Sequence, residues 1–136
     1  MGAWSSILQA EPDSVSVPDL TGQWVSAVST CTDSTKGIKC SLKATLNIQN
    51  IGTADSGSFV TKYYLSDDDI FDGGDTYLKQ VSITKIVAGT SITKNLNYNF
   101  SYGISIPGKY IIAVIDADNA VEESDENNNI VAGLIQ

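Results

Sequence analysis

The sequence predicts an all-β protein, an immunoglobulin-like antiparallel β-sandwich of about seven strands. Three observations support this prediction. Apolar and polar residues alternate with a period of two in much of the chain, and turn-forming residues recur about every ten residues. No segment shows the period of about 3.6 residues that an amphipathic helix needs. Short strands separated by regular turns are typical of two antiparallel sheets packed face to face.

The length of 136 residues fits one domain. Residues 1–16 contain serine, proline and small side chains, and we expect them to form a linker or the end of a preceding module. The sandwich domain is expected over residues 17–136. Its first strand is predicted within residues 17–28, where Pro18 lies at the entry and its missing amide donor is tolerated.

The second strand is the clearest of the set. Every second residue from Leu42 to Ile48 is apolar and the residues between them are polar, which indicates one dry and one wet face. Residues 110–115, YIIAVI, are apolar on both faces and are therefore expected in the middle of a sheet. The remaining strands are predicted at residues 59–65, 77–87, 92–100 and 128–134.

Two cysteines, Cys31 and Cys40, bracket the polar segment TDSTKGIK, which contains a Lys36-Gly37 turn signal. The chain has no histidine and no CxxC spacing, so a zinc site is hard to build. We favour a disulfide at the base of a hairpin-like loop, with two buried free thiols as the alternative. A disulfide would stabilise the fold by about 2–3 kcal/mol and would indicate an oxidising, extracytoplasmic compartment.

The acidic residues are concentrated in two segments. The net charge is −8, and most of the 16 acidic residues lie in SDDDIFDGGDTY (residues 66–77) and DADNAVEESDENNNI (residues 116–130). With this charge and no arginine, binding to a phosphate backbone is disfavoured, so we expect no nucleic-acid partner. No apolar run reaches the roughly 18 residues of a membrane span, so no membrane insertion is expected.

Four sequence pieces, in this order and spacing, closely resemble the CARDB domain, the cell-adhesion-related domain of bacterial and archaeal surface and secreted proteins. They are Asn50-Ile51-Gly52, Tyr64-Leu65-Ser66 followed by DDDIFDGGD, Pro107-Gly108-Lys109-Tyr110, and DADNAVEESDENN at residues 116–128. The resemblance covers about residues 18–133. It implies an immunoglobulin-like sandwich, single or in arrays, beside proteases, glycan-degrading enzymes or adhesion modules, and it implies no catalytic residues. The cysteine pair is not part of this pattern.

Each acidic segment is a candidate calcium site, because calcium binds six to eight oxygens and would offset the repulsion between carboxylates. Neither segment has the spacing of an EF-hand. The first candidate is an irregular site of Asp67, Asp69, Asp72 and Asp75, and the alternative is a solvated loop. The second, weaker candidate is Asp116, Asp118, Glu122 and Glu126. Because the strands that precede them should be antiparallel neighbours, the two segments are expected at opposite poles.

Several residues of these segments have expected structural roles. Phe71, with Ile70, is predicted to hold the first segment against the core. In the second segment, Val121 is predicted to pack into the core, while Asn127 and Asn128 satisfy backbone groups where the last strand begins. Val121→Ser is therefore expected to destabilise the fold by about 1–3 kcal/mol. Glu123→Ala is expected to have almost no effect.

The function predicted from these observations is that of a non-enzymatic module, extracellular or at the cell surface, with an adhesive or spacer role. Its partners would be surface proteins, glycans or neighbouring domains of the same chain, and it would be monomeric in isolation. The alternatives are a calcium-stabilised module and a carbohydrate-binding accessory domain of a secreted hydrolase. Trp4, Trp24 and the tyrosines could stack on sugars, although Trp24 is more typical of a core residue. Catalysis is disfavoured, because crowded acids in a turn lack an apolar pocket that would raise one pKa.

Overall fold

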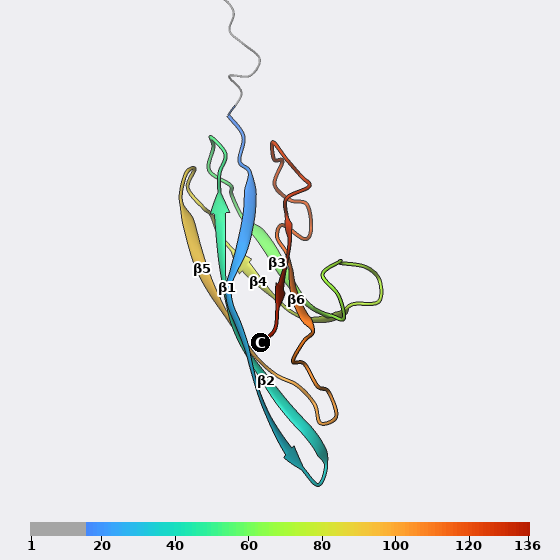
Figure 1. The fold of residues 1–136 in the computed structure, drawn as a ribbon. Helices are drawn as coiled ribbons and strands as arrows, with labels where there is room; N and C mark the ends of the chain where they lie inside the picture. Colours follow the sequence, from blue (N-terminus) through green and yellow to red (C-terminus); the bar gives the residue numbers. More distant parts are fainter. Residues whose placement is uncertain (1–15) are drawn as a thin grey trace, which may run out of the picture.

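The computed structural model describes residues 16–136, which form two packed antiparallel sheets (Figure 1). The strands are β1 (Leu20–Ser34), β2 (Gly37–Asn50), β3 (Phe59–Ser66), β4 (Thr76–Ile83), β5 (Ser91–Asn99), β6 (Tyr110–Val114) and β7 (Ile130–Leu134). One sheet has the order β1-β2-β5 and the other the order β4-β3-β6-β7. The predicted sandwich is confirmed. Among the described residues, no helix is long and apolar enough to cross a membrane.

The first hairpin is longer than the sequence suggested. We expected the first strand to end near residue 28, but β1 continues to Ser34 and β2 already begins at Gly37. Gly37 has a φ of 113°, a conformation that glycine adopts without strain. The predicted disulfide is present: Cys31 and Cys40 are bonded and face each other directly in the β1–β2 ladder. The segment between them is therefore the paired end of a hairpin and not a separate loop.

The hydrophobic core lies between the two sheets. Leu46 and Ile48 of β2 are fully buried, as the alternating pattern predicts. Ile111 and Ile112 of β6 are both fully buried although they point to opposite faces. Ile111 belongs to the core, whereas Ile112 lies outside the core cluster, between Tyr64 of β3 and Ala132 of β7 in the sheet. β6 itself lies between β3 and β7. The prediction that this apolar run lies mid-sheet is therefore correct.

Trp24 connects β1 with β7 across the edge of the sandwich. Its indole Nε1 donates a hydrogen bond to the carbonyl oxygen of Val131 at 3.1 Å, and its ring centroid lies 5.9 Å from that of Tyr63. The ring also contacts Gly133, where an added Cβ would lie 2.8 Å from the indole. Trp24 is therefore a packing residue and not an exposed sugar platform. Trp4 lies outside the described residues.

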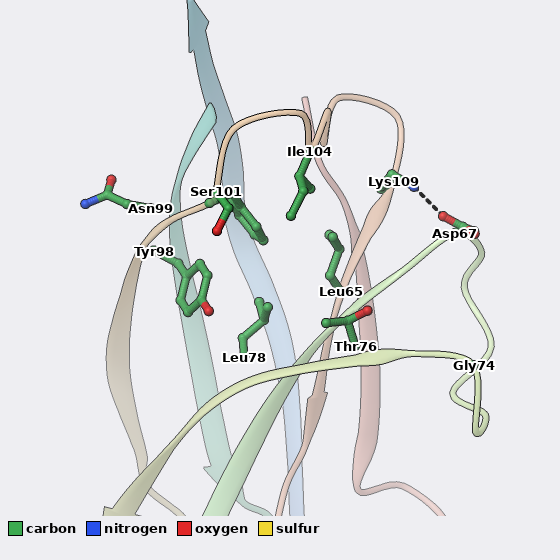
Figure 2. A pocket seen from close by; sticks show the side chains of 11 residues that line it. Leu65, Asp67, Gly74, Thr76, Leu78, Tyr98, Asn99, Ser101, Ile104 and Lys109 are labelled. Atoms are coloured by element: carbon green, nitrogen blue, oxygen red, sulfur yellow. Dashed lines mark hydrogen bonds and ion pairs between the residues drawn. The ribbon is translucent and has the colours of Figure 1, made fainter. Parts of the chain in front are cut away.

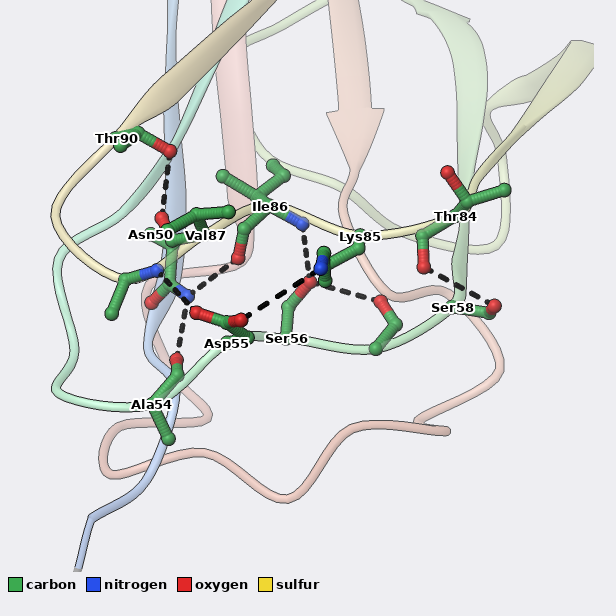
Figure 3. Close-up of polar contacts among 12 residues, drawn as sticks. Asn50, Ala54, Asp55, Ser56, Ser58, Thr84, Lys85, Ile86, Val87 and Thr90 are labelled. Atoms are coloured by element: carbon green, nitrogen blue, oxygen red, sulfur yellow. Dashed lines mark hydrogen bonds and ion pairs between the residues drawn. The ribbon is translucent and has the colours of Figure 1, made fainter.

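Asn50, the last residue of β2, uses its whole side-chain amide for hydrogen bonding (Figure 3). The Oδ1 atom accepts from the backbone N–H groups of Asp19 and Gly52, each at 3.0 Å. The Nδ2 group donates to the carbonyl oxygens of Ala54 at 2.8 Å and Ile86 at 3.0 Å. One buried side chain thus connects the entry of β1 with the β2–β3 and β4–β5 loops.

The same two loops are joined by further polar contacts (Figure 3). The hydroxyl of Ser56 accepts a hydrogen bond from the backbone N–H of Ile86 at 2.9 Å. The carboxylate of Asp55 accepts one from the N–H of Ala88 at 2.9 Å and lies 3.9 Å from the ammonium of Lys85. This end of the sandwich is consequently organised by side-chain to backbone bonds where the sheet ladders stop.

We predict that Asn50→Ala lowers the free energy of unfolding by roughly 3 kcal/mol or more, because two N–H and two C=O groups lose their partner in a buried place. Urea unfolding measures the change. Asn97→Ala on the exposed face of β5 is the control and should stay within about 0.5 kcal/mol of the parent. Similar losses for the two variants would contradict this role of Asn50.

Candidate functional site

The two acidic segments lie at opposite poles of the sandwich. β3 and β6 are antiparallel, and Ser66 at the end of β3 pairs with Tyr110 at the start of β6. The first segment follows β3, so it lies at the pole where β6 begins. The second segment follows β6 and lies at the pole where β1 begins, near Leu20. The segments are therefore two separate features, as the expected topology implied.

In the first segment, the four predicted calcium ligands are not brought together. Asp67 forms an ion pair with Lys109, and Asp69 is exposed. The carboxylates that do cluster are those of Asp68, Asp72 and Asp75, with one oxygen of each within 4.8 Å of the others. Only two residues of the predicted set thus belong to this cluster, because the Lys109 ammonium draws Asp67 away.

Hydrogen bonds within the first segment explain much of its acidity. The Ser66 hydroxyl donates to Oδ1 of Asp75 at 2.7 Å, and Oδ2 of Asp75 accepts from the N–H of Asp72 at 3.0 Å. Oδ1 of Asp68 accepts from the N–H of Ile70 at 3.1 Å. These aspartates shape the turn in the usual way for Asx residues, and water reaches their remaining oxygens.

The first segment is held by the outer face of a sheet and not by the core. Phe71 packs on Tyr64 of β3 with ring centroids 4.7 Å apart, and the ring centroid of Tyr77 lies 5.7 Å from that of Tyr64. Ile70, which was expected to point inward, is 63% exposed. The aromatic rings are tilted by 57° and 67° to one another, so they do not form the coplanar row that sugar stacking would need.

A pocket of about 360 Å³ opens at the same pole, between β4 and β5, which are not hydrogen-bonded to each other (Figure 2). It is lined by Leu65, Asp67, Gly74, Thr76, Leu78, Tyr98, Asn99, Phe100, Ser101, Ile104 and Lys109. Its two charged side chains, Asp67 and Lys109, are paired with each other. The pocket therefore offers an apolar wall and no free base beside a nucleophile.

In the second segment, Asp116 makes the turn that follows β6. Its backbone has a φ of 56°, and its carboxylate accepts hydrogen bonds from the N–H groups of Ala120 at 2.8 Å and Val121 at 3.0 Å. Asp118, which was expected to share a metal site with it, instead lies 3.6 Å from the ammonium of Lys62. Val121 is buried in the core with 5% of its surface exposed.

Glu123 was not among the predicted site residues, yet its side chain is buried and hydrogen-bonded. It is 8% exposed, and its Oε1 accepts hydrogen bonds from the N–H of Leu20 at 2.8 Å and from Nδ2 of Asn129 at 3.0 Å. Glu123→Ala was expected to have almost no effect, as for an exposed side chain. The side chain is instead buried and accepts two hydrogen bonds. No sequence signal identified this, because two residues of spacing from Val121 predict a shared face only within a regular strand, and residues 121–124 are not a strand.

The asparagines at the end of the segment have different roles from those expected. Asn127 is exposed, and the side chain of Asn128 donates to Oδ1 of Asp19 at 3.0 Å. The residue whose side chain binds the backbone is Asn129, whose Nδ2 donates to the carbonyl oxygen of Leu20 at 2.8 Å. The assignment was off by one residue, because three consecutive asparagines give no sequence signal for which one points inward.

Glu123 belongs to a cluster of carboxylates with Asp116 and Glu126, in which one oxygen of each lies within 4.8 Å of the others. This set replaces the predicted one: Asp118 pairs with Lys62, and Glu122 is exposed. Burial raises the pKa of Glu123 from 4.5 to about 7, the hydrogen bonds from Asn129 and Leu20 oppose the rise, and the nearby negative charges of Glu126 and Asp116 add to it.

The chain is similar to known proteins in sequence and in fold. The CARDB family model matches residues 17–133. The CARDB domain of a Pyrococcus furiosus protein, described as a complex with di-metal ions, has a TM-score of 0.56 at 20% identity, covering 88% of this chain and 90% of that chain. A domain of a Methanosarcina acetivorans protein, named as a candidate cell surface protein, has a TM-score of 0.56 at 21% identity, covering 86% and 89%. No curated protein matches the chain at a significant level.

We predict that, without divalent cations, stability falls as the pH rises from about 5 to about 8. The pKa of Glu123 is raised from 4.5 to about 7, so the folded state holds a proton that the unfolded state has released. This contribution is complete below the unfolded pKa and is lost as the pH rises through the folded pKa. Its size should be about 1–3 kcal/mol.

Urea unfolding at the two pH values in the presence of a chelator measures this change. Glu123→Gln keeps an oxygen that accepts from Leu20 and Asn129 but cannot titrate, so the decline should be largely absent in this variant. The chain has no histidine, so few other groups titrate in this range. An equal decline in parent and variant would show that Glu123 is not its source.

Proposed function

This chain belongs to the CARDB family, and from that membership and its fold we propose that it is a non-catalytic module of a surface protein that acts as a spacer between neighbouring parts. The proposal places it outside the cytoplasm, in agreement with the Cys31–Cys40 disulfide. Its partners would then be adjoining domains of the same protein. The observation that carries the spacer role is the arrangement of the first and last strands.

β1 and β7 run in the same direction along one edge of the sandwich. Three hydrogen bonds join the two segments, and their residue numbers rise along both: Asn129 to Leu20 at 2.8 Å, Trp24 to Val131 at 3.1 Å, and Ser29 to Gln136 at 3.0 Å. The last pair is reinforced by a bond from the N–H of Gln136 to the carbonyl oxygen of Ala27 at 2.9 Å. The chain therefore enters at one pole and leaves toward the other.

This geometry suits a module that transmits tension. A pull on the residues before β1 and after β7 draws the two strands past each other, so that their hydrogen bonds bear the load together instead of opening one at a time. The first hairpin is closed by its disulfide near the far end of β1. This kind of resistance suits a spacer that holds neighbouring parts of a protein apart.

An adhesive or sugar-binding role has less support from the same residues. The aromatic side chains of Tyr64, Phe71 and Tyr77 are tilted against each other, and the two charged side chains at the pocket are paired with each other. Glycan-array binding by the isolated domain would favour adhesion over the spacer role.

We predict that Trp24→Phe lowers the force needed to unfold the domain when it is pulled by its ends between two reference domains, because the bond to Val131 is lost. Leu96→Val in β5 is the control, since it lowers stability by about 1 kcal/mol away from the β1–β7 edge. Its unfolding force should change less than that of Trp24→Phe. A larger drop for Leu96→Val would contradict a load-bearing edge.

A second candidate function, which can coexist with the first, is stabilisation by calcium. Two groups of carboxylates are present in the described part of the chain, and both are made of the hard oxygen donors that calcium prefers. The Pyrococcus domain with the same fold is described with di-metal ions. A module at the cell surface would meet millimolar calcium, so that even a weak site would be occupied.

We predict that about 5 mM calcium stabilises the domain by about 1–2 kcal/mol relative to a chelator, for a Kd of about 10⁻⁴ to 10⁻³ M. Thermal unfolding followed by circular dichroism measures the shift, with sodium chloride of equal ionic strength as the control for screening. Identical melting curves in calcium and in chelator would remove calcium from the proposed function and leave the spacer role untouched.

A further inference from the structure

We propose that Asp116, Glu123 and Glu126 form a binding site for one hard divalent cation of the calcium class, at the pole where β1 begins. The proposal rests on the calcium binding proposed above and assigns it to one of the two acidic clusters. It also replaces two of the ligands expected in this segment with Glu123.

The spacing of the three carboxylates fits a single ion. One oxygen of each residue lies within 4.8 Å of the others. Calcium binds oxygen at 2.3–2.6 Å, so two ligands on opposite sides of the ion are at most about 5 Å apart. All three side chains could therefore contact one ion without a change in the fold.

Glu123 supplies an independent observation that points to a ligand. Its side chain is more than nine-tenths buried, and its Oε1 already accepts hydrogen bonds from Leu20 and Asn129. Its Oε2 is buried and has no hydrogen-bond partner among the described residues. A buried carboxylate oxygen without a partner is costly, and a bound cation would remove that cost.

The local charge leads to the same conclusion. Asp116 and Glu123 are both buried, yet the ion pairs formed within residues 16–136 are Lys62 with Asp118, Lys85 with Asp55, and Lys109 with Asp67. None of these lysines neutralises the cluster. Oε2 of Glu126 accepts from the N–H of Glu123 at 3.0 Å, which leaves its Oε1 available as a ligand.

The first cluster lacks this combination. Asp68 and Asp72 are exposed, and the carboxylate of Asp75 is occupied by Ser66 on one oxygen and the N–H of Asp72 on the other. Water can solvate the remaining oxygens. The first cluster therefore serves as a matched control on the same molecule.

An ion in the proposed site would do more than neutralise charge. Glu123 holds the backbone of Leu20 through its other oxygen, and Asp116 holds the backbone of Ala120 and Val121. Binding would thus fasten the β6–β7 loop to the entry of β1. The pole at which the chain enters the domain would become stiffer when the ion is bound.

The test is a calcium titration of the full chain near neutral pH, followed by amide chemical shifts and thermal unfolding, on the parent and two variants. Glu123→Gln keeps the acceptor for Leu20 but places an amide where the free oxygen was. Asp72→Asn makes the matched change in the first cluster. We expect shifts at Leu20, Ala120 and Val121, affinity at least about tenfold weaker in Glu123→Gln, and affinity unchanged in Asp72→Asn.

The outcomes separate the two proposals. Shifts confined to residues 67–75, with affinity lost in Asp72→Asn and kept in Glu123→Gln, would overturn this assignment while calcium binding itself stands. An absence of any response in the parent would overturn both the assignment and the calcium-stabilised function. The unfolding curve of Glu123→Gln without calcium shows whether that variant is folded.

Discussion

The entry of β1 is the constraint on which both sheets depend. Asp19 and Leu20 are buried at the start of the strand, so those of their backbone groups that the β1–β2 ladder does not pair need partners from elsewhere. Asn50 supplies one to the N–H of Asp19, and Glu123 and Asn129 supply two to Leu20. Asn50 ends β2, whereas Glu123 and Asn129 belong to the β6–β7 loop, so the start of β1 is hydrogen-bonded to both.

The two acidic segments show how surroundings assign different roles to the same residue types. In the first, aspartates lie in water and accept hydrogen bonds from their own loop, which is an ordinary way to build a turn. In the second, Asp116 and Glu123 are both buried, and the negative charge of Asp116 helps to raise the pKa of Glu123. Only the second arrangement needs a proton or a cation to offset the cost of burial. Composition alone would have ranked the first segment higher.

The features that hold the fold together also favour a structural role for the module. Trp24 of β1 is hydrogen-bonded to β7, the disulfide links the two strands of the first hairpin, and Asn50 is hydrogen-bonded to the loop at the pole where β1 begins. None of these three features forms a catalytic type of site, in which a free base lies beside a nucleophile. The spacer role and the proposed cation site agree, because both concern the stiffness of the domain between its two ends.

The sequence by itself determined the sandwich, the approximate positions of its strands and the separation of the acidic segments, because these depend on local alternation and on strand order. It favoured the disulfide but left two free thiols open, and the register that places Cys31 opposite Cys40 decided between them. Only the tertiary structure decided which acids meet. Lys62 and Lys109, from other parts of the chain, draw Asp118 and Asp67 away from the expected sets. Whether Glu123 faces water or the core depends on the packing of β1 against the β6–β7 loop, residues that are about a hundred positions apart in sequence.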